Sequence, residues 1–428
     1  MPKKTVPFDI AGRRIELSSP DKVVFPDAGI TKLEIAEYFV HVADGAVRGV
    51  RDRPMMLKRF PKGIQEPPFY QKRAPAGRPD WIPTVTLAFP SGRTAEEVVV
   101  RDAAALLWVV QQGCVDLNPH PTRMDDLEHP DELRIDLDPL PGIPWSQTVS
   151  IAVLAKEVLA EHGLTGWPKT SGSKGFHILV PIEPRWGFQD VRSAALAVAR
   201  ELERRAPGRA TARWWKEERQ GVFVDYNQNA KDRTVASAYS IRPVPDARVS
   251  APLHWDEVPD CDPSAYTLRT MPERFAALGD LHAPMDTQPR GDLTSLLQLA
   301  AEQLATEPDA PWPPNYPKMP GEAPRVAPSK AKGSRVPKKP LRTLANSPDQ
   351  DAALAGLERW KARHPEVVPH LEPHDILVDA MRGRFSTWTR IRVNLQHVPP
   401  ELHPPVEPPD PDDDPTREWR ASFAKRDG

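Results

Sequence analysis

Two aspartates, Asp136 and Asp138, stand two residues apart in the stretch 131–139, Asp-Glu-Leu-Arg-Ile-Asp-Leu-Asp-Pro. Polar residues there alternate with apolar ones, which are Leu133, Ile135 and Leu137. The alternation predicts a strand with both carboxylates on one face, because strand side chains at i and i+2 share a face. Two such charges repel unless a cation lies between them, and Mg²⁺ or Mn²⁺ prefers a site made of oxygen atoms. Taken alone, the pair fits a solvated edge strand as well as a metal site, and the rest of the chain must decide between the two.

A third acid and a loop of small residues extend this chemistry. Asp225 follows a short apolar run, Gly-Val-Phe-Val. The loop at 169–177, Lys-Thr-Ser-Gly-Ser-Lys-Gly-Phe-His, combines small residues with Ser, Lys and His donors that suit phosphate oxygens. It does not fit the Walker A spacing, and an ordinary surface turn is the alternative. Three carboxylates near phosphate donors predict nucleotidyl transfer with two metal ions.

Cations and aromatic rings alternate between Lys58 and Trp81, where Glu66 is the single acid before Arg78. This mixture is typical of single-stranded nucleic-acid binding, in which cations contact phosphates and rings stack on bases. A solvated basic loop whose rings turn into the core is the alternative interpretation.

The elements that must position these residues follow from local patterns. We expect a hairpin over residues 6–20 and a helix capped by Thr31, whose apolar residues have helical spacing. Further helices are predicted over 94–112 (capped by Thr94), 146–162, 188–206 and 350–364, and strands over 54–60, 176–182, 221–228, 375–378 and 387–395.

Length and composition limit the class of protein. The 428 residues suffice for two domains, and the 52 prolines predict many short elements with at least one long irregular connection. A net charge of −2 is no argument for a nucleic-acid partner, so such an argument must come from local patches. Cys114 and Cys261 match no metal-ligand spacing and suit a reducing compartment, and no stretch approaches 18 apolar residues.

Composition changes predict four regions. A catalytic domain is expected over 1–305 and a Pro-rich basic linker over 306–348. A small module over 349–400 and an acidic, Pro-rich and disordered tail over 401–428 complete the chain.

Taken together, three motifs resemble one group of archaeo-eukaryotic primase-type polymerases. They are the Asp-Leu-Asp-Pro strand, the loop at 169–177, and Val-Asp-Tyr-Asn-Gln-Asn with a downstream Arg-Pro. The chain is similar to the polymerase domain of bacterial multifunctional ATP-dependent ligases of end joining, and more so to stand-alone bacterial primase-polymerases. The resemblance covers residues 10–290. It implies an α+β fold, in which an N-terminal αβ module and an RRM-like metal-binding module form the catalytic core and a small C-terminal α/β extension follows.

The resemblance also implies residue roles. The catalytic metal ligands are Asp136, Asp138 and Asp225, and they hold two Mn²⁺ or Mg²⁺ ions. The residues that bind the incoming NTP or dNTP are Lys58, Ser171, Lys174, His177, Gln228 and Arg242. The residues that grip a 5′-phosphate on the downstream DNA strand are Lys22 and Lys32, and those that stack on the template are Phe69 and Tyr70.

One stretch departs from the family pattern. Ligase-linked domains carry a histidine two residues before an aromatic, where this chain has Asn118 and His120. The role of that histidine is therefore not transferred to His120, for which a buried position with a structural partner is expected.

The expected function is a template-dependent DNA/RNA polymerase, or primase-polymerase, that fills short gaps or extends DNA ends during repair by end joining and prefers ribonucleotides. Its expected partners are gapped or broken DNA with a 5′-phosphate, a separate ATP-dependent DNA ligase and an end-binding protein. A cytoplasmic, nucleoid-associated location is expected, with no membrane partner. A non-catalytic DNA-end-binding module that recruits a ligase, and a metal nuclease or phosphohydrolase, are the alternatives.

Overall fold

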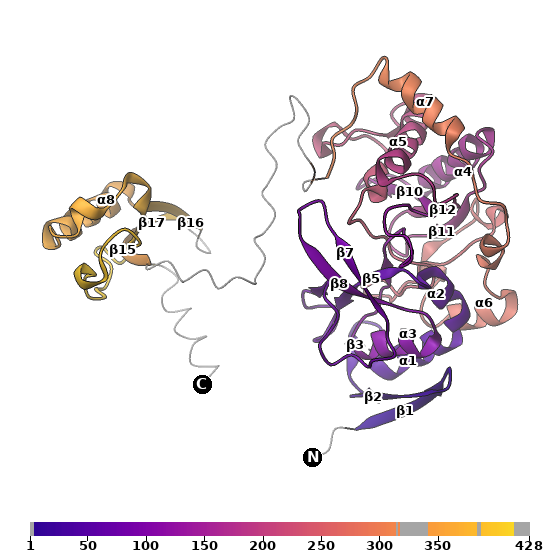
Figure 1. Ribbon diagram of the computed structural model, residues 1–428, viewed down its shortest axis with the longest axis horizontal. Coiled ribbons are helices and arrows are strands. Elements are labelled where there is room, and N and C mark those ends of the chain that lie inside the picture. Colours follow the sequence, from indigo (N-terminus) through magenta and orange to yellow (C-terminus); the bar gives the residue numbers. More distant parts are fainter. Residues whose placement is uncertain (1–3, 314–315, 317–340, 383–386, 415–428) are drawn as a thin grey trace. The chain divides into compact units, whose positions relative to one another are not determined.

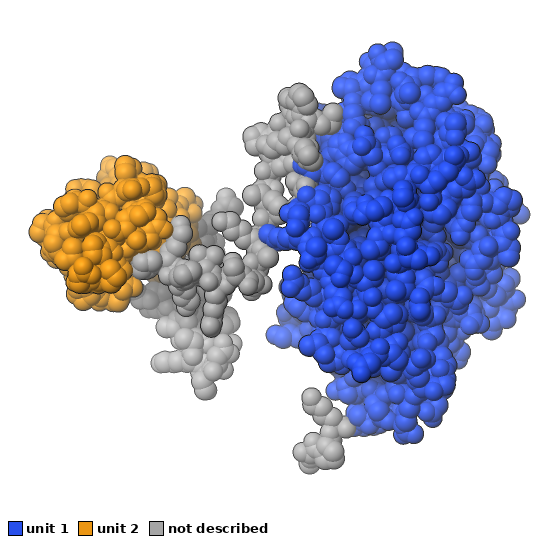
Figure 2. All heavy atoms as spheres, viewed as in Figure 1, with its two compact units in different colours: residues 1–328 blue, residues 329–428 orange. Residues whose placement is uncertain are grey.

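The computed structural model describes residues 4–313, 316, 341–382 and 387–414. They fall into two compact units, 1–328 and 329–428, each of which has its own core (Figures 1 and 2). None of the described helices is long and apolar enough to cross a membrane. The combination of helices with mainly antiparallel sheets confirms the predicted α+β class.

The first unit contains fourteen strands and seven α-helices among its described residues. The strands are β1 (Thr5–Ile10), β2 (Arg13–Ser18), β3 (Val23–Phe25), β4 (Ile30–Thr31), β5 (Pro54–Arg59), β6 (Phe69–Gln71), β7 (Thr84–Ala88), β8 (Thr94–Val99), β9 (Asn118–Pro119), β10 (Glu132–Pro139), β11 (Trp167–Thr170), β12 (Phe176–Pro181), β13 (Ala210–Thr211) and β14 (Val222–Val224). The helices are α1 (Lys32–His41), α2 (Ala43–Val50), α3 (Ala103–Gln111), α4 (Trp145–Glu161), α5 (Phe188–Arg205), α6 (Met271–Leu278) and α7 (Thr294–Leu304).

The central sheet has the strand order β11-β12-β10-β14-β13, which places β10 in the middle. The apolar residues of β10 join one core with α4 and α5, which lie on one side of this sheet in Figure 1. That burial leaves the alternate residues, including both aspartates, for the opposite face. Because β10 is hydrogen-bonded on both sides, the edge-strand alternative for Asp136 and Asp138 is wrong.

A second sheet, ordered β6-β5-β8-β7 with β9 also paired to β5, belongs to the N-terminal half. It shares a core with α1, α2 and α3. Helix α1 begins where Thr31 predicts, because Thr31 and Glu34 form a capping box.

The helix predicted over 94–112 is wrong in its first half. Residues 94–99 form β8, which pairs with β7 along five residues, and α3 begins only at Ala103. Asp102 caps α3 by accepting a hydrogen bond from the backbone N–H of Ala105 at 2.8 Å.

The second unit consists of the sheet β15-β17-β16 and one α-helix in the described residues. Its elements are β15 (Leu341–Ser347), α8 (Gln350–Arg363), β16 (Ile376–Arg382) and β17 (Thr387–Asn394). Trp360 of α8 and Ile391 of β17 lie in its core.

Two boundaries differ from those predicted by composition. The range 306–348, predicted as linker, contains the strand β15, and its residues 314–315 and 317–340 lie outside the described part. The tail predicted as disordered from 401 is ordered to residue 414, since Asp410 N–H donates to Leu344 O at 2.8 Å and Asn346 N–H donates to Pro411 O at 2.7 Å. Proline-rich chain can line the edge of a sheet through its carbonyl groups, which composition alone does not reveal.

Candidate active site

Three carboxylates of the central sheet lie close together, one on a buried, one on an exposed and one on a half-buried residue. Asp136 and Asp138 project from β10, and Asp225 follows β14, which pairs with β10. One oxygen of each carboxylate lies within 4.8 Å of the others. We call these three residues the acidic triad.

The acidic triad is electrostatically incomplete without a cation. Burial raises the pKa of Asp225 to about 6, with the charge of Asp138 adding to the shift. Burial, followed by the charges of Asp138 and Asp225, raises the pKa of Asp136 well above its ordinary value. The Oδ1 atom of Asp136 is buried and, although His177 Nε2 lies 3.3 Å away, it accepts no well-directed hydrogen bond within the described residues. Carboxylates that lack compensation in this way fit one or two divalent cations.

Asp225 is held in place by its neighbours in the short 3-10 helix η2 (Tyr226–Asn229). It accepts hydrogen bonds from the backbone N–H of Asn227 at 3.1 Å and from Nε2 of Gln228 at 3.0 Å. Gln228 therefore lies at the acidic triad, as the resemblance implies.

The loop at 171–175 connects β11 to β12 beside the triad. Ser171 Oγ accepts hydrogen bonds from the backbone N–H groups of Ser173 at 3.1 Å and Gly175 at 3.0 Å. These two hydrogen bonds hold the loop in its turn conformation. The hydroxyl proton of Ser171 is not used in them and is available for a hydrogen bond to a ligand. A Cβ atom at Gly175 would collide with the carbonyl oxygen of Leu137 on β10, so glycine is required there. Lys174 is exposed at the loop's apex.

His177 connects this loop to the acidic triad through the strand register, which pairs it with Asp136. Lys169 Nζ lies 2.6 Å from His177 Nδ1 and also donates to Ala236 O and Ser250 Oγ, both at 2.7 Å. A protonated Lys169 would make Nδ1 the acceptor and leave the ring proton on Nε2, which lies 3.3 Å from Asp136 Oδ1. Burial lowers the pKa of His177 well below its usual value, and the charges of Lys169 and Arg242 add to this.

Two further predicted nucleotide-binding cations occupy different environments. Arg242 acts electrostatically on Asp136 and Asp138, and its buried Nε atom has no hydrogen-bond partner in the described chain. Lys58, at the end of β5, donates to Asp116 Oδ2 at 2.8 Å. The structure thus places Arg242 beside the acidic triad and Lys58 in an ion pair with Asp116.

Lys169 and Arg219 are site residues that sequence reasoning missed. Lys169 is fully buried against His177, and burial holds its pKa well below the ordinary value. Arg219 acts on both Asp138 and Asp225, and its guanidinium carbon lies 3.5 Å from the ring centroid of Phe223. Lysine at 169 was visible in the loop motif, whereas the segment around Arg219 has no local pattern that would single it out.

The residues predicted to contact DNA lie in the N-terminal half. Lys22 and Lys32 are neighbours, since Lys32 N–H donates to Lys22 O at 2.8 Å. Lys32 Nζ donates to Ser18 O, Gln111 O and Gln111 Oε1 at 2.7–3.1 Å, and Lys22 Nζ donates to Pro61 O. Burial lowers the pKa of Lys32 to about 8, with Lys22 and Arg59 adding to the shift.

Phe69 and Tyr70 on β6 are 54% and 58% exposed. Two neighbouring aromatic residues with this exposure are unusual in a folded unit, which favours a contact surface over the predicted alternative of rings turned into the core. The two flanking rings do turn toward the core, since Phe60 is buried and Trp81 is half-buried against the same core.

Asn118 and His120 are buried in β9 and just after it. His120 Nε2 lies 3.2 Å from Glu97 Oε2, and Asn118 Nδ2 donates to Asp116 O at 3.3 Å. His120 therefore has the structural partner that was expected.

Comparisons with known proteins identify a family to which this chain is similar. A family model described as "LigD, primase-polymerase domain" matches residues 31–282. The multifunctional non-homologous end joining protein LigD of Mycolicibacterium smegmatis is 33% identical over 276 residues, which are 64% of this chain and 36% of that protein. The corresponding protein of Pseudomonas aeruginosa is 34% identical over 62% of this chain and 32% of its own length. The matched region thus spans about a third of these relatives.

A solved structure is also similar to this chain. The polymerase domain of Mycobacterium tuberculosis ligase D in complex with DNA has 32% sequence identity and a TM-score of 0.61. The match covers 64% of this chain and 99% of that one.

Proposed function

Because the chain belongs to the LigD primase-polymerase domain family and is thus a nucleotidyltransferase, we propose that it extends a DNA primer against a template to fill short gaps or join broken ends. The observation that supports this best is the acidic triad beside the Ser171–His177 loop. We further propose that ribonucleotides are preferred and that two divalent ions, Mn²⁺ or Mg²⁺, take part.

The acidic triad supplies the metal ligands in this proposal. Bound ions there would neutralise the triphosphate, activate the primer hydroxyl and stabilise the leaving pyrophosphate. Asp225, held by Gln228, is the carboxylate assigned to the primer 3′ end. Its raised pKa means that ion binding must compete with a proton below about pH 6.

The loop and its neighbours hold the nucleotide phosphates in this proposal. Ser171 donates its hydroxyl proton, Lys174 and Arg242 supply positive charge, and His177 donates from Nε2. Lys169 fixes the tautomer of His177 from behind and is too buried to contact substrate itself.

Lys58 is assigned to the nucleotide as well, although it is paired with Asp116 in the described structure. A bound triphosphate would have to compete with Asp116 for the ammonium group of Lys58. Alternatively, Lys58 would contact the triphosphate while it stays paired with Asp116.

The DNA partner is a gapped or broken duplex with a 5′-phosphate. Lys22 and Lys32 are assigned to that phosphate, and Phe69 and Tyr70 to template bases. A separate ATP-dependent DNA ligase and an end-binding protein are proposed as protein partners, in a cytoplasmic, nucleoid-associated setting.

A primer-extension assay on gapped DNA with Mn²⁺ tests the proposal. The variants Asp136→Ala and Asp138→Ala are expected to lose activity by about a hundredfold or more, because they remove ligands that act in the transition state. DNA binding should be retained in both. Exposed Asp260→Ala is the matched control and should extend primers normally.

The same assay separates the alternatives. Extension retained in both triad variants would overturn the metal assignment, and DNA binding without extension by the wild type would indicate a non-catalytic end-binding module. Products shorter than the primer would indicate a nuclease. Competition between ribonucleotides and deoxyribonucleotides, on gaps with and without a 5′-phosphate, tests the substrate preferences.

A further inference from the structure

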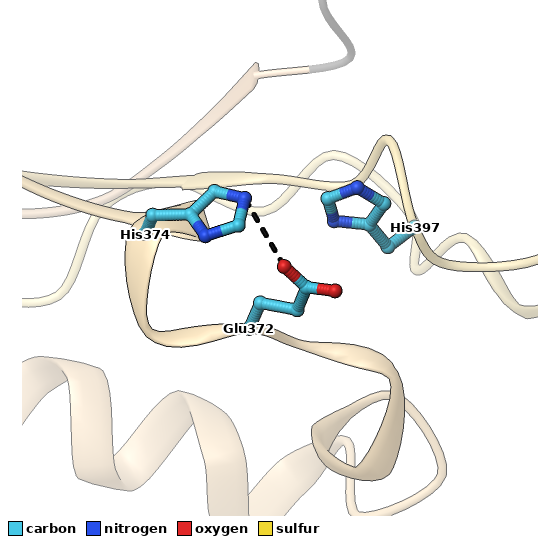
Figure 3. A group of neighbouring side chains, drawn as sticks. All are labelled: Glu372, His374 and His397. Carbon is cyan, nitrogen blue, oxygen red and sulfur yellow. Dashed lines mark ion pairs between the residues drawn. The ribbon is translucent and has the colours of Figure 1, made fainter.

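A second group of metal-ligating side chains lies in the second unit, outside the acidic triad. Glu372, His374 and His397 converge on a common space (Figure 3). One ligand atom of each residue lies within 4.8 Å of the others, and all three residues are exposed.

The fold brings these residues together from two turns at the same end of the sheet. Glu372 and His374 lie at the short 3-10 helix η7 (Pro373–Asp375), directly before β16, whereas His397 follows β17. Antiparallel pairing places the start of β16 beside the end of β17, with Ile376 opposite Val393. The backbone positions of the group are therefore fixed by the sheet.

Two of the ligand atoms are already at the spacing that a metal ion imposes. Glu372 Oε2 and His374 Nε2 are 3.2 Å apart, and zinc bonds of about 2.0–2.1 Å at tetrahedral angles place ligands about 3.3 Å apart. The rings of His374 and His397 are perpendicular, with centroids 5.6 Å apart. Exposed side chains can close the remaining separation by rotamer changes, without movement of the sheet.

A buried carboxylate, that of Asp375, contacts one histidine of this group. Asp375 has no exposed surface, and its Oδ2 atom lies 2.7 Å from His397 Nδ1. Asp375 is fixed in turn by the backbone N–H of Glu372 at 3.1 Å and by Asn394 Nδ2 at 3.3 Å. A carboxylate that is hydrogen-bonded to a histidine orients the ring and increases its basicity as a ligand, an arrangement that recurs behind metal sites. Because Asp375 occupies Nδ1, the metal would bind Nε2 of His397, which lies 3.2 Å from Gln396 Nε2 and would exchange that contact for the ion.

We propose that Glu372, His374 and His397 bind a transition-metal ion of the Zn²⁺ class and that Asp375 is a positioning residue for His397. Two imidazoles with one carboxylate match the nitrogen and oxygen donors that Zn²⁺ prefers, unlike the all-oxygen acidic triad. Three protein ligands leave a fourth position for water or an incoming ligand. The proposal does not depend on the polymerase function.

Metal analysis of the full chain tests the site. The protein is incubated with Zn²⁺ in excess Mg²⁺, which occupies the all-oxygen site, then desalted and analysed for retained zinc. We expect one zinc per chain in the wild type and none in the double variant His374→Ala/His397→Ala. The variant His370→Ala, which removes an exposed histidine two residues before Glu372, is the matched control and should retain the ion.

Cobalt substitution tests the geometry and the role of Asp375. Co²⁺ in the wild type should give the visible absorption of a tetrahedral site, which the double variant should lack. Asp375→Asn should weaken the affinity for Co²⁺ by about tenfold to a hundredfold while the metal-free chain keeps its circular dichroism. Equal zinc retention by the wild type and the double variant, or loss of zinc by His370→Ala, would overturn the proposal.

Discussion

The residues of the acidic triad destabilise the metal-free fold, because their carboxylates repel one another in the arrangement that suits bound cations. Asp225 is stabilised by two hydrogen bonds, whereas Oδ1 of Asp136 receives no well-directed one within the described residues. The charges of Arg219 and Arg242 compensate the three carboxylates only in part, since the pKa values of Asp136 and Asp225 remain raised. The contribution of the acidic triad to the stability of the metal-free protein should therefore be least favourable at a pH at which all three groups are ionised.

The pH dependence of the unfolding free energy of the metal-free protein tests whether Asp225 destabilises the fold when it is ionised. Its folded pKa of about 6 lies above the ordinary value of 3.8, so the folded state binds more protons between these values than the unfolded state. The contribution of Asp225 to the free energy of unfolding should consequently be fully present below about pH 4 and be lost as the pH rises to about 6. Two pH units correspond to at most about 3 kcal/mol. Urea unfolding in a chelator, for the wild type and Asp225→Asn, measures the difference.

Asp225→Asn removes this titration, so the stability difference between variant and wild type should grow in favour of the variant across that pH range. Acidic groups outside the acidic triad titrate equally in both proteins and cancel in the comparison. Asp136 also loses the neighbouring charge of Asp225 in the variant, which shifts the difference in the same direction. A difference that stays constant between pH 4 and pH 7 contradicts the prediction. Added Mn²⁺ should stabilise the wild type more than the variant at pH 7.

Lys32 provides a second residue-scale prediction, at the proposed 5′-phosphate site. With a pKa of about 8, its ammonium group is charged at pH 7 and mostly neutral at pH 9. The preference for gaps that carry a 5′-phosphate should therefore fall by about tenfold over this range, as a charged hydrogen bond is lost. Binding of the two kinds of gap by fluorescence anisotropy measures the effect.

The variant Lys32→Arg separates charge from structure at this position. Arginine keeps its charge at pH 9, so the preference should become independent of pH. An identical pH dependence in wild type and Lys32→Arg would show that another group is responsible, and would limit Lys32 to connecting α1 with Ser18 and Gln111.

At the scale of elements, β6 presents both aromatic rings of the proposed template contact. Phe69→Ala and Tyr70→Ala should each weaken binding of gapped DNA by about tenfold or more, since stacking on one base contributes about 1–3 kcal/mol. The unfolding free energy should change by less than about 0.5 kcal/mol, because both rings are exposed. Anisotropy with a labelled template and thermal unfolding give the two readouts.

Leu278→Ala is the control for β6, because it also removes an exposed apolar side chain, which is 49% exposed at the end of α6. It should leave DNA binding unchanged. Unaltered binding in both aromatic variants would exclude β6 from the template contact.

The elements that carry the acidic triad were predictable from sequence because their signals are local. β10 alternates apolar and polar residues and β12 is a continuous apolar run, and their apolar residues form one core with those of α4 and α5. The sequence motifs also identified the carboxylates that the structure brings together. Their separation of less than 4.8 Å required the pairing of β10 with β14, which no local pattern encodes.

Errors arose where distant residues determine the local structure. Glu97 favoured a helix at 94–112, yet it is fully buried in β8, where its side chain contacts His120. The carboxylate of Glu97 is buried beside His120, which follows β9 and is distant in sequence. The local pattern of acidic and apolar residues therefore wrongly predicted a helix. Arg219 was missed for the same reason, because its proximity to Asp138 and Asp225 arises from tertiary packing.

At the scale of the whole molecule, composition identified a second module but not its extent. The module includes β15 on one side and chain to residue 414 on the other, and Arg359 of α8 bonds to Asp410 Oδ2 at 2.9 Å. We propose that the two compact units are independent domains, with the catalytic domain in the first. Their hydrophobic cores share no residue among those described.

Independent domains should unfold in separate transitions, which calorimetry of the full chain can resolve. Trp360 lies in the core of the second unit, and Leu133 lies in a core of the first. Trp360→Ala should lower the unfolding free energy of the second unit alone, by about 3–5 kcal/mol. Leu133→Ala should lower that of the first unit alone, by about 2–5 kcal/mol. In each case only the transition of the unit concerned should move to lower temperature. Each variant is the control for the other, because each removes a buried apolar side chain. If either substitution shifts both transitions, or if the wild type unfolds in a single transition that both variants lower, the units are energetically coupled and the proposed division into domains fails.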